Sequence, residues 1–212
     1  MRLNRRILVR GASLLGLMLA AGWALWQVTL WAFPFPYRAE VLEAAATSGL
    51  DPRLILALAR AESGFRPQAV SREGAVGLLQ VTPTTAAWVA SQRGLTPPGA
   101  EILADPGYNL ETGAWYLAWL LGQFQGRLAP AVAAYNAGSA PVRRWLEQGT
   151  WDGTPALARR IPYRETRVFV RRVLGGYAVY RHLYPGLGSP GGGFSLRQPP
   201  SPPMPPGADH GT

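Results

Sequence analysis

One carboxyl in this sequence stands where it could transfer a proton. A helix is predicted to begin at Asp51-Pro52, a good N-cap followed by a proline suited to the first turn, and to end at the left-handed stop Gly64. Glu62 lies in its last turn, four and eight residues after Leu58 and Leu54, so the three side chains share a face. Burial beside apolar neighbours raises the pKa of a carboxyl. Glu62 is therefore a candidate general acid, and a solvated helix-end residue is the alternative.

A glycine-rich run and a later helix end add polar groups that could line a cleft. The segment Gly64 to Gln80 contains too many glycines for a long helix, and its apolar centre indicates a tight loop or a small hairpin pressed against the fold. Farther along, Tyr135 and Asn136 stand at the end of a predicted helix, where side chains can project into a cleft. A core aromatic is the alternative for Tyr135, and closing a backbone turn is the alternative for Gln80.

A second carboxyl occupies a different electrostatic environment. Tyr163 and Glu165 fall in the first turn of the last predicted helix. The dipole of a helix favours negative charge at its N-terminus, so Glu165 is expected to stay ionised while Glu62 is driven toward its neutral form. Capping the helix, or an ion pair with Arg164 or Arg167, is the structural alternative for Glu165.

The composition excludes several classes of site. The 212 residues include no cysteine and only two histidines, which excludes disulfides, thiolate chemistry and a histidine-rich metal site. The net charge of +9 comes from arginine alone, and the part of the chain after the first apolar run carries +5. This charge suits an anionic polymer or an anionic membrane surface. Nucleic acid is not expected, because no nucleic-acid motif accompanies the arginines between Arg159 and Arg172.

An uncharged run of 23 residues, from Gly11 to Phe33, is long enough to span a bilayer. The basic segment 1–10 should remain in the cytoplasm, and Trp23, Trp26 and Trp31 gather toward the far end, as expected at a membrane interface. We therefore expect a single-pass membrane anchor, with the rest of the chain outside the cytoplasm. The alternative is a signal peptide cleaved near Ala20-Ala21-Gly22, followed by secretion.

Beyond this run the sequence predicts a mostly α-helical domain at 34–185 and a disordered Pro/Gly-rich tail at 186–212. Pro34 and Pro36 break the first helix and open a linker. Helices are expected over Arg38–Ser48, Asp51–Ser63, Thr82–Ser91, from Asp105-Pro106, over Leu128–Asn136, from Ser139, and over Pro162–Tyr184.

Four short runs occur in an order that resembles the catalytic domain of the soluble lytic transglycosylases, peptidoglycan-cleaving enzymes of the lysozyme-like superfamily. The runs are Glu62-Ser63, Gly74 to Gln80, Ala134 to Gly138 and Ile161 to Arg167. Each is weak alone, but the four in sequence order are specific. The resemblance extends from about residue 50 to residue 183 and implies a mostly α, lysozyme-like fold with a small hairpin or loop.

By this resemblance Glu62 takes the position of the family's catalytic acid and base. Ser63, Gln80, Tyr135, Asn136, Tyr163 and Glu165 take positions that bind substrate or shape the glycan cleft. No metal and no cofactor are implied. The chain departs from the family at Leu79, where methionine is usual and an apolar subsite wall is expected, and at Glu73, an additional acid between two of the runs.

The family reaction implies a non-hydrolytic mechanism. Most glycosidases use two carboxylates that flank the scissile bond. In this family one carboxyl protonates the β-1,4 bridge between N-acetylmuramic acid and N-acetylglucosamine, and the substrate's N-acetyl group stabilises the cationic centre. The same carboxylate then deprotonates the muramoyl 6-hydroxyl, which closes on C1 to give a 1,6-anhydro end. The tethered hydroxyl avoids the entropy of recruiting a nucleophile.

Two other functions compete with this expectation. A goose-type muramidase would hydrolyse the same bond, with Glu73 or another acid activating water. A membrane-tethered wall-binding protein would use the same cleft without cleaving. In each case the expected partners are peptidoglycan glycan strands and, through the N-terminal helix, the membrane, and larger cell-envelope machinery is a further candidate.

Overall fold

The computed structural model describes residues 5–97 and 99–187, and the chain divides into two units between Phe35 and Pro36. The first unit contains one helix, α1 (Arg5–Ala32). Its stretch from Ser13 to Ala32 is long and apolar enough to cross a membrane, and none of it is buried. A signal sequence has the same properties, so the helix agrees with both alternatives derived from the sequence.

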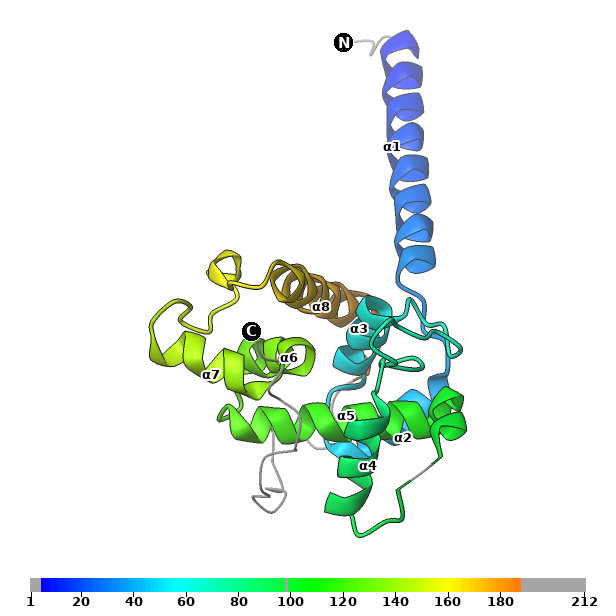
Figure 1. The fold of residues 1–212 in the computed structure, drawn as a ribbon. Coiled ribbons are helices and arrows are strands. Elements are labelled where there is room, and N and C mark those ends of the chain that lie inside the picture. The colour runs from blue at the N-terminus through cyan, green and yellow to red at the C-terminus, as the bar shows by residue number, and fades with distance from the viewer. Residues whose placement is uncertain (1–4, 98, 188–212) are drawn as a thin grey trace. The chain divides into compact units, whose positions relative to one another are not determined.

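The second unit is built from helices joined by short connections (Figure 1). No strand forms among the residues that the structure describes. The elements are α2 (Arg38–Ser48), α3 (Pro52–Glu62), α4 (Pro83–Gln92), η1 (Ala100–Ala104), α5 (Pro106–Gln123), α6 (Leu128–Ala137), α7 (Ser139–Glu147), η2 (Ala158–Arg160) and α8 (Arg164–Leu183), where η denotes a 3₁₀ helix.

Three of these helices begin with an N-cap side chain followed by proline, as the sequence predicts. The pairs are Asp51-Pro52, Thr82-Pro83 and Asp105-Pro106, and each cap oxygen accepts a hydrogen bond from a main-chain N–H two or three residues later, at 2.8–3.1 Å. Such caps satisfy amides that have no partner inside the helix. The predicted helix starts at 51–52, 82–83 and 105–106 are confirmed. The last helix begins two residues later than predicted, at Arg164.

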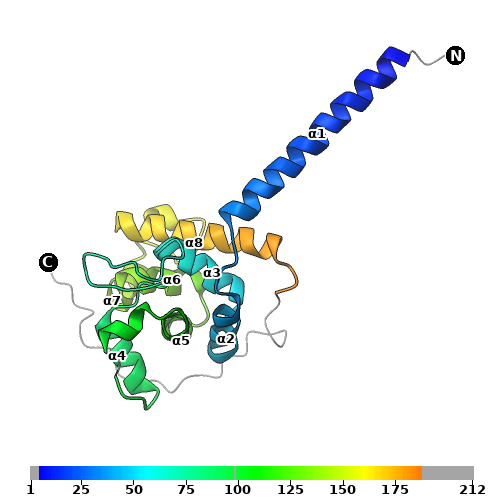
Figure 2. The same cartoon turned by 90° about the vertical axis from the view of Figure 1, so that its right-hand side faces the viewer.

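Helix α3 is the most deeply buried helix in the second unit. Every side chain from Leu54 to Ala59 is buried, and the helix packs against α2 and α8 (Figure 2). The sequence predicted an apolar stripe on one face, but the structure encloses this part of the helix on all sides, as is typical of a helix that is apolar all round. Glu62, the last residue of α3, therefore stands at the end of a buried helix.

The glycine-rich segment between α3 and α4 forms a tight loop. Two isolated antiparallel bridges pair Val76 with Val70 and with Val81. The buried side chain of Asn109, on α5, accepts a hydrogen bond from Leu79 N at 2.7 Å and donates to Val76 O and Leu103 O, both at 2.8 Å. These bonds hold the loop to α5. The predicted loop or hairpin is present as a loop with bridges.

The close approach of the Asn109 side chain explains why residue 77 in the loop is glycine. Gly77 has a positive φ of 85°, and a Cβ at this position would overlap the Asn109 side chain. Only glycine satisfies both the backbone conformation and the space. The predicted tail at 186–212 lies outside the described residues from residue 188 onward.

Candidate active site

Glu62 has a neutral carboxyl at neutral pH. Its side chain is half-buried at the end of α3, and burial, followed by the negative charge of Glu165, raises its pKa to about 8. Neither ion pair within residues 5–97 and 99–187 involves Glu62: one joins Asp51 to Arg53 and the other joins Arg93 to Glu111. With no cation to stabilise its ionised form, the carboxyl retains its proton. The raised pKa predicted from the sequence is confirmed, and the catalytic role remains a prediction.

Tyr135 lies close to Glu62. Burial and the charge of Glu62 raise the pKa of the Tyr135 hydroxyl well above its usual value, so it remains a hydrogen-bond donor. It donates to Leu79 O at 2.9 Å, and its ring lies beside Tyr116 with 5.5 Å between ring centroids. A residue from α6, 73 positions later in the chain, is thus brought next to the end of α3.

Gly113 on α5 allows this arrangement. A Cβ at this position would come within 2.6–2.9 Å of Leu79 side-chain atoms and of the Tyr135 hydroxyl. Leu79 itself is fully buried. The expectation that Leu79 forms the apolar wall of a subsite is therefore wrong for this structure, because the side chain fills the space above Gly113 instead.

Ser63 and Gln80 hold the loop against the end of α3. Ser63 is buried, and its hydroxyl donates to Leu78 O at 2.9 Å. Gln80 has a positive φ of 48°, and its amide donates to Gly77 O at 2.9 Å and to Ala69 O at 3.1 Å. The Ser63 hydroxyl and the Gln80 side-chain nitrogen thus bond to main-chain carbonyls, and the substrate-binding role of both residues remains a prediction.

The remaining predicted residues lie at the start of α8 and at the end of α6 beside it. Glu165 is exposed, and its charge acts on Glu62. Asn136 accepts a hydrogen bond from the hydroxyl of buried Thr166 at 2.6 Å. Thr166 was not singled out from the sequence, because nothing local indicates a partner 30 residues away. Tyr163 is 50% exposed and lies edge-on to Trp145, with ring centroids 5.0 Å apart.

Of the two acids considered as partners of Glu62, Glu165 is the one whose charge acts on it. Glu73 is fully exposed in a turn, where hydrogen bonds from its own amide and from Ser71 lower its pKa. The alternative ion pair of Glu165 with Arg167 does not form, because the Arg167 guanidinium donates to Ile161 O at 3.1 Å instead. Among the described residues no cluster of three His, Cys, Asp or Glu side chains could hold a metal ion.

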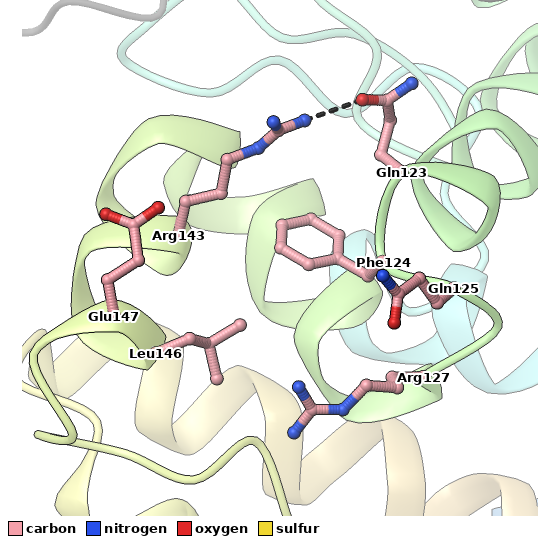
Figure 3. A pocket seen from close by; sticks show the side chains of 7 residues that line it. All are labelled: Gln123, Phe124, Gln125, Arg127, Arg143, Leu146 and Glu147. Carbon is pink, nitrogen blue, oxygen red and sulfur yellow. Dashed lines mark hydrogen bonds between the residues drawn. The ribbon is translucent and has the colours of Figure 1, made fainter.

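A pocket of about 260 Å³ lies elsewhere, at the end of α5 and beside α7 (Figure 3). The Arg143 guanidinium lies over the Phe124 ring and donates to Gln123 Oε1 at 2.6 Å. None of the predicted site residues lines this pocket, whose wall consists of Gln123, Phe124, Gln125, Arg127, Arg143, Leu146 and Glu147. It is therefore separate from the cluster around Glu62.

Known proteins with similar sequences share this arrangement of helices. The family model of the transglycosylase SLT domain matches residues 40–156. The soluble lytic murein transglycosylases of Escherichia coli K12 and Salmonella typhimurium LT2 are 35% and 34% identical over 164 and 162 residues, which is 75% of this chain and 25% of each relative. This chain thus spans about a quarter of the length of the curated relatives that it matches.

Two solved structures show the same fold. The 70-kDa soluble lytic transglycosylase of Escherichia coli has a TM-score of 0.69 at 32% identity and covers 79% of this chain and 28% of its own. An inactive glutamate-to-glutamine mutant of the lytic transglycosylase Slt from Pseudomonas aeruginosa has a TM-score of 0.67 at 33% identity. The match covers 74% of this chain and 26% of the Pseudomonas aeruginosa chain. The predicted mostly α, lysozyme-like fold is confirmed by this likeness.

The close contact at Gly113 can be tested with a pair of glycines on α5. Gly113→Ala should destabilise the protein by about 1–3 kcal/mol, because the new methyl group displaces Leu79 and the Tyr135 hydroxyl. Gly122→Ala is the control, since no atom lies within 4 Å of its Cβ position, and it should gain about 0.5–1 kcal/mol in helix propensity. Denaturant unfolding measures both, and equal effects would contradict the packing described here.

The raised pKa of Glu62 predicts a pH-dependent stability. Between the ordinary pKa of 4.5 and the folded value of about 8, the folded state holds a proton that the unfolded state releases, so the wild type loses stability as pH rises. Glu62→Gln removes this penalty. The variant should match the wild type near pH 4.5 and exceed it by about 2–4 kcal/mol at pH 8 in denaturant unfolding.

Glu73→Gln is the matched control, because the Glu73 carboxyl is exposed and its pKa is lowered. It should show no gain in stability over the wild type as pH rises. A constant difference between Glu62→Gln and the wild type across this range would mean that the Glu62 carboxyl is ionised in the folded protein.

Proposed function

Because this chain belongs to the transglycosylase SLT domain family, we propose that it is a lytic transglycosylase. It cleaves the β-1,4 bond between N-acetylmuramic acid and N-acetylglucosamine in peptidoglycan and leaves a 1,6-anhydromuramoyl end. The observation that carries this proposal is the protonated, half-buried carboxyl of Glu62, which has no cation beside it and a pKa of about 8. A carboxyl in this state can donate a proton at neutral pH, which a glycosidic oxygen requires to leave.

Glu62 acts twice in the proposed reaction. As an acid it protonates the bridging oxygen, and the substrate's N-acetyl group stabilises the cationic centre at C1. As a carboxylate it then removes the proton of the muramoyl 6-hydroxyl, whose oxygen bonds to C1 and closes the anhydro ring. The proton lost in the first step is recovered in the second, so the enzyme ends in its starting state. The inactive glutamate-to-glutamine mutant of the Pseudomonas aeruginosa relative supports a glutamate in this role.

Glu165 supports the acid role of Glu62. Its negative charge lies at the exposed N-terminus of α8 and raises the pKa of Glu62, which keeps the proton in place until substrate arrives. The same charge is suited to stabilise positive charge that develops on the sugar in the transition state. We assign Tyr135, Asn136 and Tyr163 to the cleft beside these two carboxyls.

Ser63 and Gln80 complete the proposed substrate-binding set. The Ser63 hydroxyl and the Gln80 side-chain nitrogen are bonded within the protein, so these groups contribute to the cleft through the shape of the loop that they hold. The reaction as proposed uses no metal and no cofactor.

The presence of a second carboxyl keeps a goose-type muramidase as the alternative. Most glycoside hydrolases use two carboxylates, one on each side of the scissile bond. If the reaction is hydrolytic, Glu165 rather than Glu73 is the acid placed to activate water, because only Glu165 acts electrostatically on Glu62. The two reactions differ in their products.

The location proposed for the enzyme follows from helix α1. Its length and composition suit a single-pass anchor in the bacterial inner membrane, with the catalytic domain at 34–185 on the periplasmic side. The alternative is a secreted domain released by signal cleavage. In both cases the active site meets peptidoglycan outside the cytoplasm.

The products of digestion test the reaction. Purified peptidoglycan incubated with the full chain should release muropeptides with anhydro ends, one water lighter than reducing ends in mass spectrometry. Glu62→Gln should lower the release by about 10²- to 10⁴-fold, the usual contribution of a general acid-base group. Glu73→Gln is the control and should stay within about twofold of the wild type. Products with reducing ends alone would establish the muramidase reaction instead.

The pH dependence of kcat/KM tests the protonation state of Glu62. Because the acid form is needed first, activity should be constant below neutrality and fall about tenfold per pH unit above pH 8. Glu165→Gln removes a charge that raises the Glu62 pKa, so the fall should begin at lower pH in that variant. An alkaline limb that does not move in Glu165→Gln would contradict the proposed coupling between the two carboxyls.

A further inference from the structure

The charge of the second unit is concentrated in one segment. From Ala158 to Leu183, over η2 and α8, the chain carries seven arginines and one acid, Glu165. The rest of residues 34–187 carries nine arginines and ten acids. The positive excess of this unit therefore belongs entirely to η2 and α8, and the remainder of the unit is close to neutral.

Three of these arginines lie on the outward side of α8. Arg164, Arg171 and Arg172 are exposed, while Val170 and Val173 on the other side of the helix are buried in the core. The spacing of seven residues between Arg164 and Arg171 places them on one line along the helix. We call this surface the basic face; it consists of Arg159, Arg160, Arg164, Val168, Arg171, Arg172, Gly175 and Ala178, all exposed.

The charges of the basic face are not neutralised by neighbouring acids. Neither ion pair within the described part of the chain involves an arginine of this face. Val168, which is 37% exposed, lies between its cations, and the small residues Gly175 and Ala178 follow them along α8. Such a surface is low in relief, so an extended anionic partner can approach several guanidinium groups together.

The C-terminal end of α8 lies beside the start of α3, and the charge of Arg38 on α2 also reaches it. Arg53 Nη1 donates to Tyr184 O at 3.5 Å. Burial raises the pKa of the Tyr184 hydroxyl, and the positive charge of Arg38, the first residue of α2, partly opposes this rise. Only the five residues 33–37 separate α1 from α2. Fully extended, they reach at most about 18 Å. Connectivity therefore keeps the start of α2, and with it the second unit, near any membrane that holds α1.

We propose that the basic face of η2 and α8 docks on the anionic surface of the membrane in which the N-terminal helix is inserted. The proposal rests on the anchored location assigned above. Each arginine close to an anionic lipid surface strengthens binding by about fivefold, so the five arginines of this face act together. The linker of residues 33–37 is short, so it keeps the basic face at a high effective concentration near the lipid headgroups. An anionic polymer that is not linked to the chain has no such increase in effective concentration.

Docking would fix the orientation of the catalytic cleft. The N-terminal end of α8 carries Tyr163 and Glu165 at the proposed cleft, and its C-terminal end lies beside the start of α3. A helix of 20 residues is about 30 Å long. With α8 lying along the lipid surface, the cleft is held close to the membrane, where it meets glycan strands near the bilayer.

Fluorescence energy transfer on the full chain in vesicles tests this proposal. The chain contains no cysteine, so one introduced cysteine carries one label. Val168→Cys places the donor on the basic face. Thr84→Cys places it at an exposed position of α4, which lies on the far side of α5 from α8 in Figure 1. The acceptor is a labelled lipid headgroup. The vesicles contain phosphatidylcholine alone or with about one third phosphatidylglycerol.

The expected result is higher transfer from residue 168 in the anionic vesicles, with no rise from residue 84. The difference should disappear at about 0.5 M NaCl, because salt screens surface charge. The double variant Arg171→Glu, Arg172→Glu should lower the ratio of docked to undocked protein by at least about tenfold. Arg143→Glu with Arg144→Glu is the matched control, since these neighbouring exposed arginines lie on α7, and it should leave the transfer unchanged.

Three results would overturn the proposal: equal transfer from residue 168 in both kinds of vesicle, an equal rise from both labelled sites, or full chain that fails to float with vesicles at high salt. Muropeptide release in detergent solution separates this proposal from the catalytic one. The Arg171→Glu, Arg172→Glu variant should keep wild-type release there, which also shows that it folds. Docking without muropeptide release would refute the catalytic proposal and leave this one standing.

Discussion

The structure depends on one constraint: a carboxyl at the end of a buried helix without a cation beside it. Helix α3 packs against α2 and α8, and its side chains from Leu54 to Ala59 are all apolar and buried. Water is partly excluded at this position, and the nearby carboxyl of Glu165 adds repulsion, so the neutral form is favoured. A cation next to Glu62 would stabilise the ionised form and remove the proton on which the proposed chemistry depends.

A chain of contacts fixes the surroundings of this carboxyl. Asn109 joins α5 to the loop that follows α3, with three hydrogen bonds made by one buried side chain. The loop in turn presents the Leu79 carbonyl to the Tyr135 hydroxyl, and Gly113 leaves the space in which they meet. Elements from three parts of the sequence are thereby held at one place. Buried amides that satisfy several main-chain groups are costly to lose, so this arrangement is rigid.

Helix α8 combines two properties that are separate in the sequence. Its buried side packs against α3 and supplies Thr166 to Asn136, while its first turn brings Glu165 toward Glu62. Its outward side carries the positive charge of the domain. Because one rigid helix bears both, a partner that binds the outward side also sets the direction of the site.

The sequence by itself determined where most of the helices begin, and it singled out Glu62 as the candidate acid. The starts of α3, α4 and α5 were predictable because a cap and a proline act on amides within the same turn. Tertiary structure alone decided which groups meet. Glu165 lies 103 residues after Glu62, Leu79 turned inward rather than toward a cleft, and Ser63 and Gln80 found their partners in carbonyls of a folded loop. Caps are local, whereas burial and long-range contacts exist only once the helices have packed.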